Sequence, residues 1–179
     1  APDASVDAEA KREVEWLIKL VSGIRGMRAE LNIPPSAHIL AIFENAEWST
    51  ISLLNKNEPS LARMARVKRF LPHGTQFFSV GAGDVDAERA TKAGAAQVVV
   101  DEVTFTFPLE GVIDIAAEKA RLEKALAVSQ KEAKSLEGRL SNPSFVEKAK
   151  PEAVEKARAD HALHAAEAER LQAALARLG

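Results

Sequence analysis

Two stripes of mostly apolar residues in the last third of the chain constrain its fold most strongly. Within each stripe the spacing alternates between three and four residues, which places all members on one face of an α-helix. The stretch 141–151 between the stripes contains two prolines, which interrupt helices. We therefore expect two long helices that pack as an antiparallel coiled-coil hairpin. The first stripe consists of Ile115, Lys119, Leu122, Leu126, Ser129, Ala133, Leu136 and Leu140, and the second of Val154, Ala157, His161, His164, Ala168, Leu171, Leu175 and Leu178.

Side-chain size in the two stripes also predicts the register of this hairpin. When Leu140 is aligned with Val154, most large side chains face small ones, which is how a close-packed seam fills its volume. Each helix has about 27 residues, so the hairpin is roughly 40 Å long at about 1.5 Å per residue. The remaining pairs of this register are Leu136 with Ala157, Ala133 with His161, Ser129 with His164, Leu126 with Ala168, Leu122 with Leu171, Lys119 with Leu175 and Ile115 with Leu178.

An earlier segment of the chain also has helical periodicity. The helix is predicted to end before Pro34, because a proline disfavours helical geometry in the residue before it. Gly23 and Gly26 lie inside this helix, where each costs about 1 kcal/mol relative to alanine. We expect close packing against another element to offset that cost. The predicted apolar face consists of Val14, Leu17, Ile18, Val21, Ile24, Met27 and Leu31.

Between this helix and the hairpin the pattern alternates between strand and helix. Strands are predicted over 37–44, 67–71, 76–80 and 97–109, and a helix that is interrupted at Pro59 over 47–64. Mixed elements of this kind predict an α+β fold, with a small α/β unit followed by the long coiled-coil hairpin. The predicted segments are a helical end over 1–35, the small α/β domain over 36–112 and the hairpin over 113–179.

Composition excludes several classes of protein. The 179 residues include no cysteine, which excludes a disulfide scaffold, a zinc ribbon and a thiol nucleophile. No apolar run reaches the roughly 20 residues that span a bilayer, and no secretory signal is visible. We therefore expect a cytoplasmic protein with no membrane partner. Because the chain begins at Ala1, we also expect it to be processed or cut from a longer protein.

No catalytic motif is complete. Gly81 and Gly83 form a GxG pattern, but the third glycine of a dinucleotide-binding fingerprint is missing. Four carboxylates lie close together in the sequence without a histidine, lysine or nucleophile beside them, so we interpret them as solvated strand edges and a helix start. The sequence therefore predicts no catalytic residue. These carboxylates belong to Asp101, Glu102, Glu110 and Asp114.

Two histidines of the second stripe have a spacing that metal ligands also use. In the predicted register His161 faces Ala133 and His164 faces Ser129, so no second pair of ligands completes a site. We therefore expect packed or partly hydrated histidines and no bound metal.

Basic residues are denser around the predicted hairpin turn, where an aromatic residue also lies. One interpretation is an ordinary charged coiled-coil exterior in which Phe145 caps the seam. The other is a nucleic-acid interface, in which the cations bind phosphates and the Phe145 ring stacks on an exposed base. The candidate interface residues are Lys131, Lys134, Arg139, Phe145, Lys148, Lys150, Lys156 and Arg158.

Three sequence strings resemble the valyl-tRNA synthetase family. IRGMRAELNIPP (24–35) is similar to the end of its anticodon-binding helical domain. PLEGVIDIAAEKARLE (108–123) resembles the entry into its C-terminal coiled coil, and LSNPSFVEKAKPEAVEK (140–156) resembles its hairpin turn. The strings occur in the family's order, whereas 74–94 looks like an insertion relative to shorter members.

This resemblance implies the C-terminal region of a bacterial valine–tRNA ligase, a class I synthetase that uses ATP with Mg. The catalytic and editing domains are not in these 179 residues, so the resemblance assigns no catalytic residue and implies that the fragment is inactive alone. It implies that the arm contacts tRNA(Val) at the outer corner of the L, where the D and T loops meet, and we expect a monomeric parent. The alternative is a coiled-coil protein-interaction or dimerisation module without RNA binding.

Overall fold

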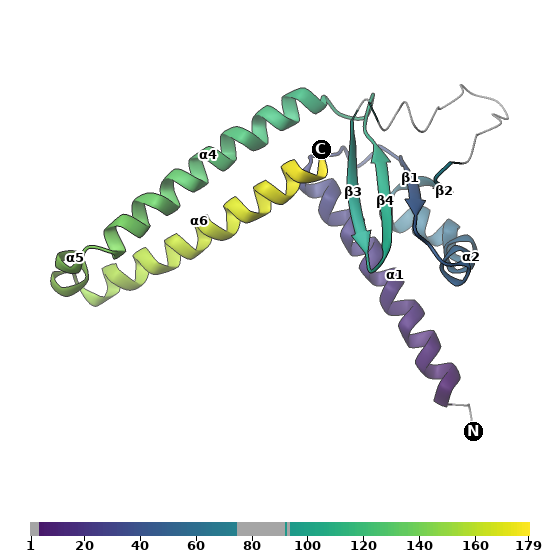
Figure 1. Cartoon of the computed structure of the whole chain (residues 1–179), viewed down its shortest axis with the longest axis horizontal. Coiled ribbons are helices and arrows are strands. Elements are labelled where there is room, and N and C mark those ends of the chain that lie inside the picture. Colours follow the sequence, from purple (N-terminus) through teal and green to yellow (C-terminus); the bar gives the residue numbers. More distant parts are fainter. Residues whose placement is uncertain (1–3, 75–91, 93) are drawn as a thin grey trace. The chain divides into compact units, whose positions relative to one another are not determined.

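The computed structural model describes residues 4–74, 92 and 94–179, and the expected strand over 76–80 lies outside them. The described residues confirm a mixed α+β fold with a four-stranded sheet (Figure 1). The elements are α1 (Ala4–Glu30), β1 (Ile39–Glu44), α2 (Trp48–Ala65), β2 (Val67–Pro72), β3 (Ala95–Val100), β4 (Val103–Pro108), α4 (Ile115–Leu140), α5 (Pro143–Lys148) and α6 (Pro151–Arg177).

The chain forms two compact units. The sheet unit comprises residues 1–115 and 177–179, and the helical unit comprises residues 116–176. The predicted segments 1–35 and 36–112 thus lie together in the sheet unit, where α1 packs against β3 and α2. No helix of the described ranges is both long and apolar enough to cross a membrane.

The sheet has the strand order β2-β1-β4-β3. β1 and β2 are parallel, as expected for strands joined through a helix, while β4 is antiparallel to both β1 and β3. Both strands predicted at 37–44 and 67–71 are therefore confirmed. The fully buried ring of Phe105 lies at the centre of the core, with the rings of Trp16, Phe43 and Phe70 at centroid distances of 6.1–6.3 Å.

The prediction of one strand over 97–109 is wrong, because this run folds as the β3–β4 hairpin. Val100 pairs with Val103, and Asp101 and Glu102 form the two-residue turn between them. Asp101 has a φ of 53°, a left-handed conformation that aspartate tolerates in tight turns. These two carboxylates are therefore in a turn and not at a strand edge, and Asp101 Oδ1 accepts a hydrogen bond from Lys19 Nζ at 3.2 Å.

The expected interruption of α2 at Pro59 is also wrong, since the helix continues to Ala65. Proline removes the amide that would bond to the carbonyl of Asn55, four residues earlier. Pro59 and Asn55 are both exposed, so water can replace that bond. Leu54 and Leu61, on either side of the proline, are fully buried and hold both halves of the helix against the sheet unit's core.

The predicted helix that carries Val14 to Leu31 is confirmed as α1, which ends one residue before Leu31, but only part of its apolar face is covered. The residues from Leu20 onward that point inward are buried, whereas Val14 and Ile18 are 54% and 59% exposed. Trp16 and Leu17 are half-buried, so the first buried position of α1, Leu20, lies six residues after Val14. The buried residues are Leu20, Val21, Ile24, Met27 and Leu31.

The two glycines of α1 differ in their surroundings. A Cβ added to Gly23 would lie 2.8 Å from Val98 Cγ1 of β3, so a glycine is needed for α1 to approach the sheet this closely. A Cβ added to Gly26 would meet nothing within 4 Å. The prediction of close packing is therefore confirmed at Gly23 and wrong at Gly26.

In the helical unit, α4 and α6 run side by side in opposite directions, with α5 at the turn (Figure 1). Every stripe residue in Lys119–Leu140 and in Val154–Leu175 is buried or half-buried. Most other residues of these two helices are exposed. The stripes are therefore the covered faces of α4 and α6, while their pairwise register stays a prediction.

Candidate nucleic-acid interface

The turn of the helical unit is built by a short capped helix. Asn142 is the N-cap of α5, and its side-chain oxygen accepts a hydrogen bond from the Ser144 amide at 3.0 Å. Pro143 occupies the first turn, where its missing N–H costs nothing. Ser141 Oγ donates to the carbonyl of Glu137 at 2.8 Å, which satisfies one of the last carbonyls of α4. The turn is thus a defined structure and not a loose loop.

The candidate residues lie around this turn, a region that we call the tip (residues 131–160). Lys131, Lys134 and Arg139 come from α4, Lys148 from α5, and Lys156 and Arg158 from α6. At about 1.5 Å per residue, each helix carries its candidate cations within roughly 15 Å of the turn. The structure therefore brings residues from three helices to one end of the helical unit.

Phe145 is half-buried and lies next to a cation. The guanidinium carbon of Arg139 is 5.8 Å from the centroid of the Phe145 ring, a distance at which a cation is attracted to the π-face. The carbonyl of Phe145 also accepts a hydrogen bond from the amide of Ala149 at 2.9 Å, which ends α5. The ring is thus held between the end of α4 and the turn while part of its surface stays accessible.

All seven candidate cations are exposed. Lys156 Nζ is 3.3 Å from Asp160 Oδ2, and Arg158 is 3.3 Å from Glu155 Oε1. Such exposed pairs contribute about 0–1 kcal/mol, so a phosphate can displace the carboxylate at little cost. Within the part of the chain that the structure describes, the remaining four lysines form no ion pair: Lys131, Lys134, Lys148 and Lys150.

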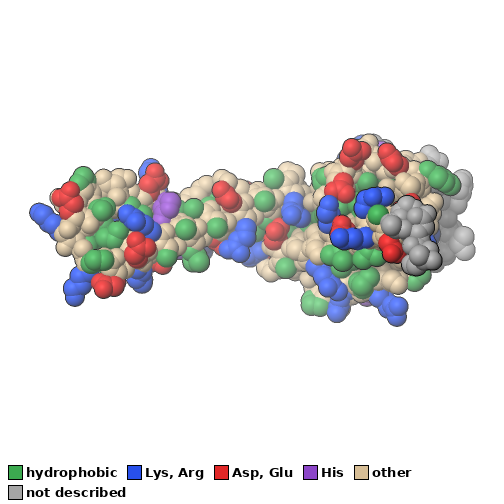
Figure 2. All heavy atoms as spheres, turned by 90° about the horizontal axis from the view of Figure 1, so that it is seen from below, with side chains coloured by type: hydrophobic (Ala, Val, Ile, Leu, Met, Phe, Trp, Pro, Cys, Tyr) green, Lys and Arg blue, Asp and Glu red, His purple; other side chains and the backbone are tan. Residues whose placement is uncertain are grey.

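The net positive charge of the tip is small. Its seven basic residues are accompanied by six acidic ones, and Figure 2 shows both kinds interspersed around the end of the helical unit at the left. Such a surface supports contacts to individual phosphates and not a strong field that attracts any polyanion. Binding at the tip therefore depends on matching shape and spacing.

The histidines of α6 are not part of a visible metal centre. His161 and His164 are half-buried on the covered face of the helix. In the described residues, no group of three or more histidine, cysteine, aspartate or glutamate side chains is placed to hold a metal ion.

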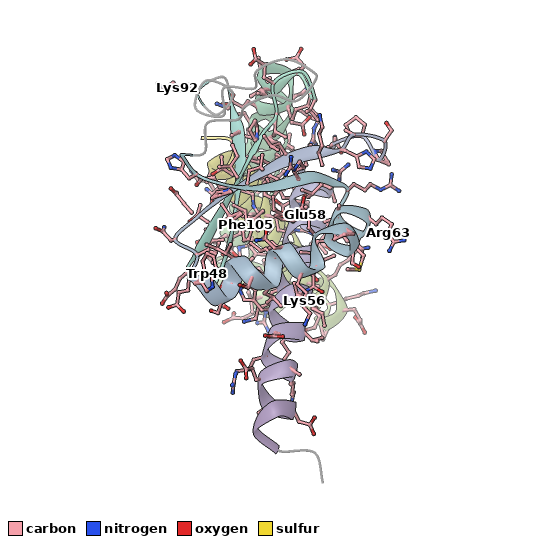
Figure 3. The ribbon with its side chains drawn as sticks, turned by 90° about the vertical axis from the view of Figure 1, so that its right-hand side faces the viewer. Trp48, Lys56, Glu58, Arg63, Lys92 and Phe105 are labelled. Carbon is pink, nitrogen blue, oxygen red and sulfur yellow. The ribbon has the colours of Figure 1, made fainter. Side chains whose placement is uncertain are left out.

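A second cationic feature, which the sequence did not reveal, lies in the sheet unit. A cavity of about 390 Å³ is lined by four arginines that come from α1 and from the end of α2. Figure 3 shows Arg63 at the end of α2 and Lys56 elsewhere on that helix. The three-residue spacing of Arg25 and Arg28 is only a weak signal of a cationic site in the sequence. These two arginines become part of a cluster because the end of α2 approaches α1. The four arginines, which we call the arginine cleft, are Arg25, Arg28, Arg63 and Arg66.

Comparison with known proteins decides which family these features belong to. Residues 114–179 match the family model described as the valyl tRNA synthetase tRNA binding arm. The chain is 49% identical to the valine–tRNA ligase of Rhizorhabdus wittichii over 175 residues, and 49% identical to that of Sphingopyxis alaskensis over 179 residues. The chain belongs to the valyl-tRNA synthetase family.

The similarity covers nearly all of this chain but a small part of the relatives. The match to the Rhizorhabdus wittichii ligase covers 98% of the chain and 18% of the relative, and the Sphingopyxis alaskensis match covers 100% and 17%. The valine–tRNA ligase of Zymomonas mobilis is 38% identical over 97% of the chain and 18% of its own length. The chain thus corresponds to the C-terminal region of a valyl-tRNA synthetase, and the helical unit lies within the match to the tRNA binding arm.

Proposed function

We propose that the helical unit is a coiled-coil arm that binds tRNA(Val) at the outer corner of the L and supports its aminoacylation with valine. The match of residues 114–179 to the valyl-tRNA synthetase tRNA binding arm carries this proposal. The exposed cations at the tip and the accessible Phe145 ring support it.

The chemistry of binding follows from the two kinds of side chain at the tip. Lysines and arginines neutralise backbone phosphates, which supplies affinity without reading base sequence. Phe145 supplies a flat apolar surface for the outermost base pair of the corner, where one face has no stacking neighbour. Folded RNA is therefore recognised by its shape.

In the complete enzyme, this binding is remote from the chemistry. The activation of valine by ATP with Mg would take place in a catalytic core outside these 179 residues, so the chain alone is inactive. The arm adds binding energy to the tRNA-dependent step, which raises the efficiency of charging without changing the activation step. The complete enzyme in this proposal is a monomer. It is a translation enzyme, so the chain acts in the cytoplasm.

Two exposed apolar residues favour a second candidate function. Val128 of α4 is 56% exposed and Leu163 of α6 is 67% exposed. Apolar side chains on the outer faces of a helical pair can dock another helix or a second copy of the chain. This alternative is a protein-interaction or dimerisation module without RNA binding.

Salt dependence separates the two functions. The affinity of the chain for a tRNA(Val) transcript is measured by fluorescence anisotropy over a series of KCl concentrations, with oligomeric state followed by light scattering. Phosphate contacts make log affinity fall linearly with log salt concentration. Absence of tRNA binding, together with a concentration-dependent dimer that salt does not weaken, would favour the protein-interaction module.

A further inference from the structure

The arginine cleft concentrates positive charge, and none of the described residues that line it is acidic. Its other lining residues in the described part of the chain are Ala29, Ile33, Pro35, Met64 and Ala65, and none of these is charged. The whole chain, in contrast, has a formal net charge of −2. The clustering of four arginines is therefore a local property that the fold creates.

The four guanidinium groups have no carboxylate partner in the described part of the chain. Arg28 is 7% exposed and donates to the carbonyls of Arg66, Pro34 and Ala37 at 3.2, 2.9 and 2.8 Å. Burial, and then the positive charge of Arg66, lower the pKa of Arg28. Backbone carbonyls thus hold this guanidinium in place, but they do not cancel its charge.

Arg28 is buried, whereas the other three arginines of the cleft are exposed. Arg25 Nε donates to the carbonyl of Met64 at 3.0 Å, and an Arg66 guanidinium N–H donates to the carbonyl of Pro35. Arg63 is exposed, and its guanidinium donates no hydrogen bond to any described residue. The Arg63 guanidinium and the unused N–H groups of Arg25 and Arg66 are therefore available to a ligand.

The backbone at Arg66 adopts a conformation that is unfavourable for any residue with a Cβ. Arg66 follows α2 with a φ of 54° and a ψ of 46°, the left-handed conformation that glycine adopts most easily after a helix. Arg66 also lines the cleft, where its positive charge contributes to lowering the pKa of Arg28. A bound anion would offset the repulsion among these charges.

We propose that the arginine cleft binds a phosphate group of the RNA backbone, as a contact with tRNA in addition to the tip. Planar guanidinium groups match the geometry of phosphate oxygens and bind them through paired N–H groups. The inference rests on the proposed function in that tRNA is the RNA concerned. It assigns the sheet unit a direct part in RNA binding.

The test replaces Arg63, the cleft arginine whose guanidinium donates no hydrogen bond to the described residues. Arg63→Gln is compared with Lys56→Gln, a control that removes an exposed positive charge from the same helix. Affinity for a tRNA(Val) transcript is measured by fluorescence anisotropy from 50 to 300 mM KCl (about the range over which phosphate contacts weaken). Arg63→Gln is expected to weaken binding roughly tenfold at low salt and to lower the salt slope by about one unit. Lys56→Gln is expected to change neither, and both variants keep the wild-type melting temperature.

Further variants distinguish failure of this inference from failure of the proposed function. If Arg63→Gln binds tRNA as Lys56→Gln does, while Lys148→Ala with Lys150→Ala weakens binding, the cleft does not hold RNA and the proposed arm function stands. An equal loss in Arg63→Gln and Lys56→Gln would overturn the cleft as well, since it reflects overall charge. If Arg63→Gln loses tRNA affinity while Lys56→Gln and the variant Lys148→Ala with Lys150→Ala keep it, the result would support the cleft and contradict the proposed role of the tip. Wild-type chain that does not bind tRNA contradicts both.

A free anion is a second source of the same chemistry, and inorganic phosphate is the probe for it. Binding of inorganic phosphate is followed by NMR through the Nε–H signals of the arginines. Phosphate binding that Arg63→Gln abolishes, together with weaker tRNA binding by that variant, supports the proposal. Phosphate binding without any effect of Arg63→Gln on tRNA affinity would overturn the assignment to RNA.

Discussion

The guanidinium carbon of Arg139, on the last turn of α4, lies 5.8 Å from the centroid of the Phe145 ring in α5. This relationship joins a cation to the aromatic side chain on which the proposed stacking depends. A cation over one part of the ring contributes about 0.5–1 kcal/mol at an exposed site, which orients the ring without burying it.

Replacement of Phe145 tests whether the ring contacts RNA. Because base–aromatic stacking contributes about 1–3 kcal/mol per base, Phe145→Ala is expected to weaken tRNA binding roughly tenfold to a hundredfold. Phe145→Trp preserves a stacking surface and serves as the matched control. Affinity and thermal stability are measured side by side. A drop in stability with unchanged affinity of the folded fraction would show that Phe145 only closes the seam.

The register of α4 against α6 is tested by a double-mutant cycle. Leu122 and Leu171 are both buried and form a pair in the predicted register. Each alanine substitution is expected to destabilise the chain by about 2–5 kcal/mol, with a coupling energy of about 0.5–3 kcal/mol between the two. Val128→Ala, at an exposed position, is expected to change stability by less than about 0.5 kcal/mol. Additive effects of the two leucine substitutions in urea denaturation would contradict the register.

The two glycines of α1 provide a matched pair of substitutions. Gly23→Ala brings a methyl group into Val98 and is expected to destabilise by about 1–3 kcal/mol, as overpacking does. Gly26→Ala meets no neighbour and is expected to stabilise by about 1 kcal/mol, because alanine favours the helix. Thermal unfolding measures both. The close approach of α1 to β3 would be refuted if the two substitutions had the same sign of effect.

Removal of residues 116–176 from a complete valine–tRNA ligase separates activation from charging. Valine-dependent exchange of pyrophosphate into ATP is expected to stay nearly intact, while kcat/KM for tRNA charging falls, because only the second step uses remote tRNA binding. Both rates are measured on the same preparation. An equal loss of the two activities would point to a structural role of the helical unit in the enzyme.

Patterns that depend on local spacing were predictable from the sequence. The stripes of α4 and α6 have a strict spacing, and the covered faces of both helices follow it. The candidate cations of the tip could be grouped because they lie within a few helical turns of the same pair of prolines. The structure places all seven at the exposed surface of that end.

Features that depend on tertiary contacts were not predictable. The run 97–109 contains no glycine or proline between Val99 and Val103, so Asp101 is the one turn-forming residue there, which is a weak signal for a turn. Exposure decides the effect of Pro59 in α2, and exposure is not visible in the sequence. The arginine cleft exists only because the end of α2 approaches α1, which brings Arg63 and Arg66 to Arg25 and Arg28.

Backbone footprinting shows whether the tip contacts the outer corner of tRNA. Hydroxyl-radical cleavage of a tRNA(Val) transcript is compared with and without the chain, and with the variant Lys148→Glu with Lys150→Glu. The wild-type chain is expected to protect the backbone where the D and T loops meet, and this variant is expected to lose the protection. Protection that is absent from the D and T loops, or that is the same for wild type and variant, would show that the tip does not bind the outer corner.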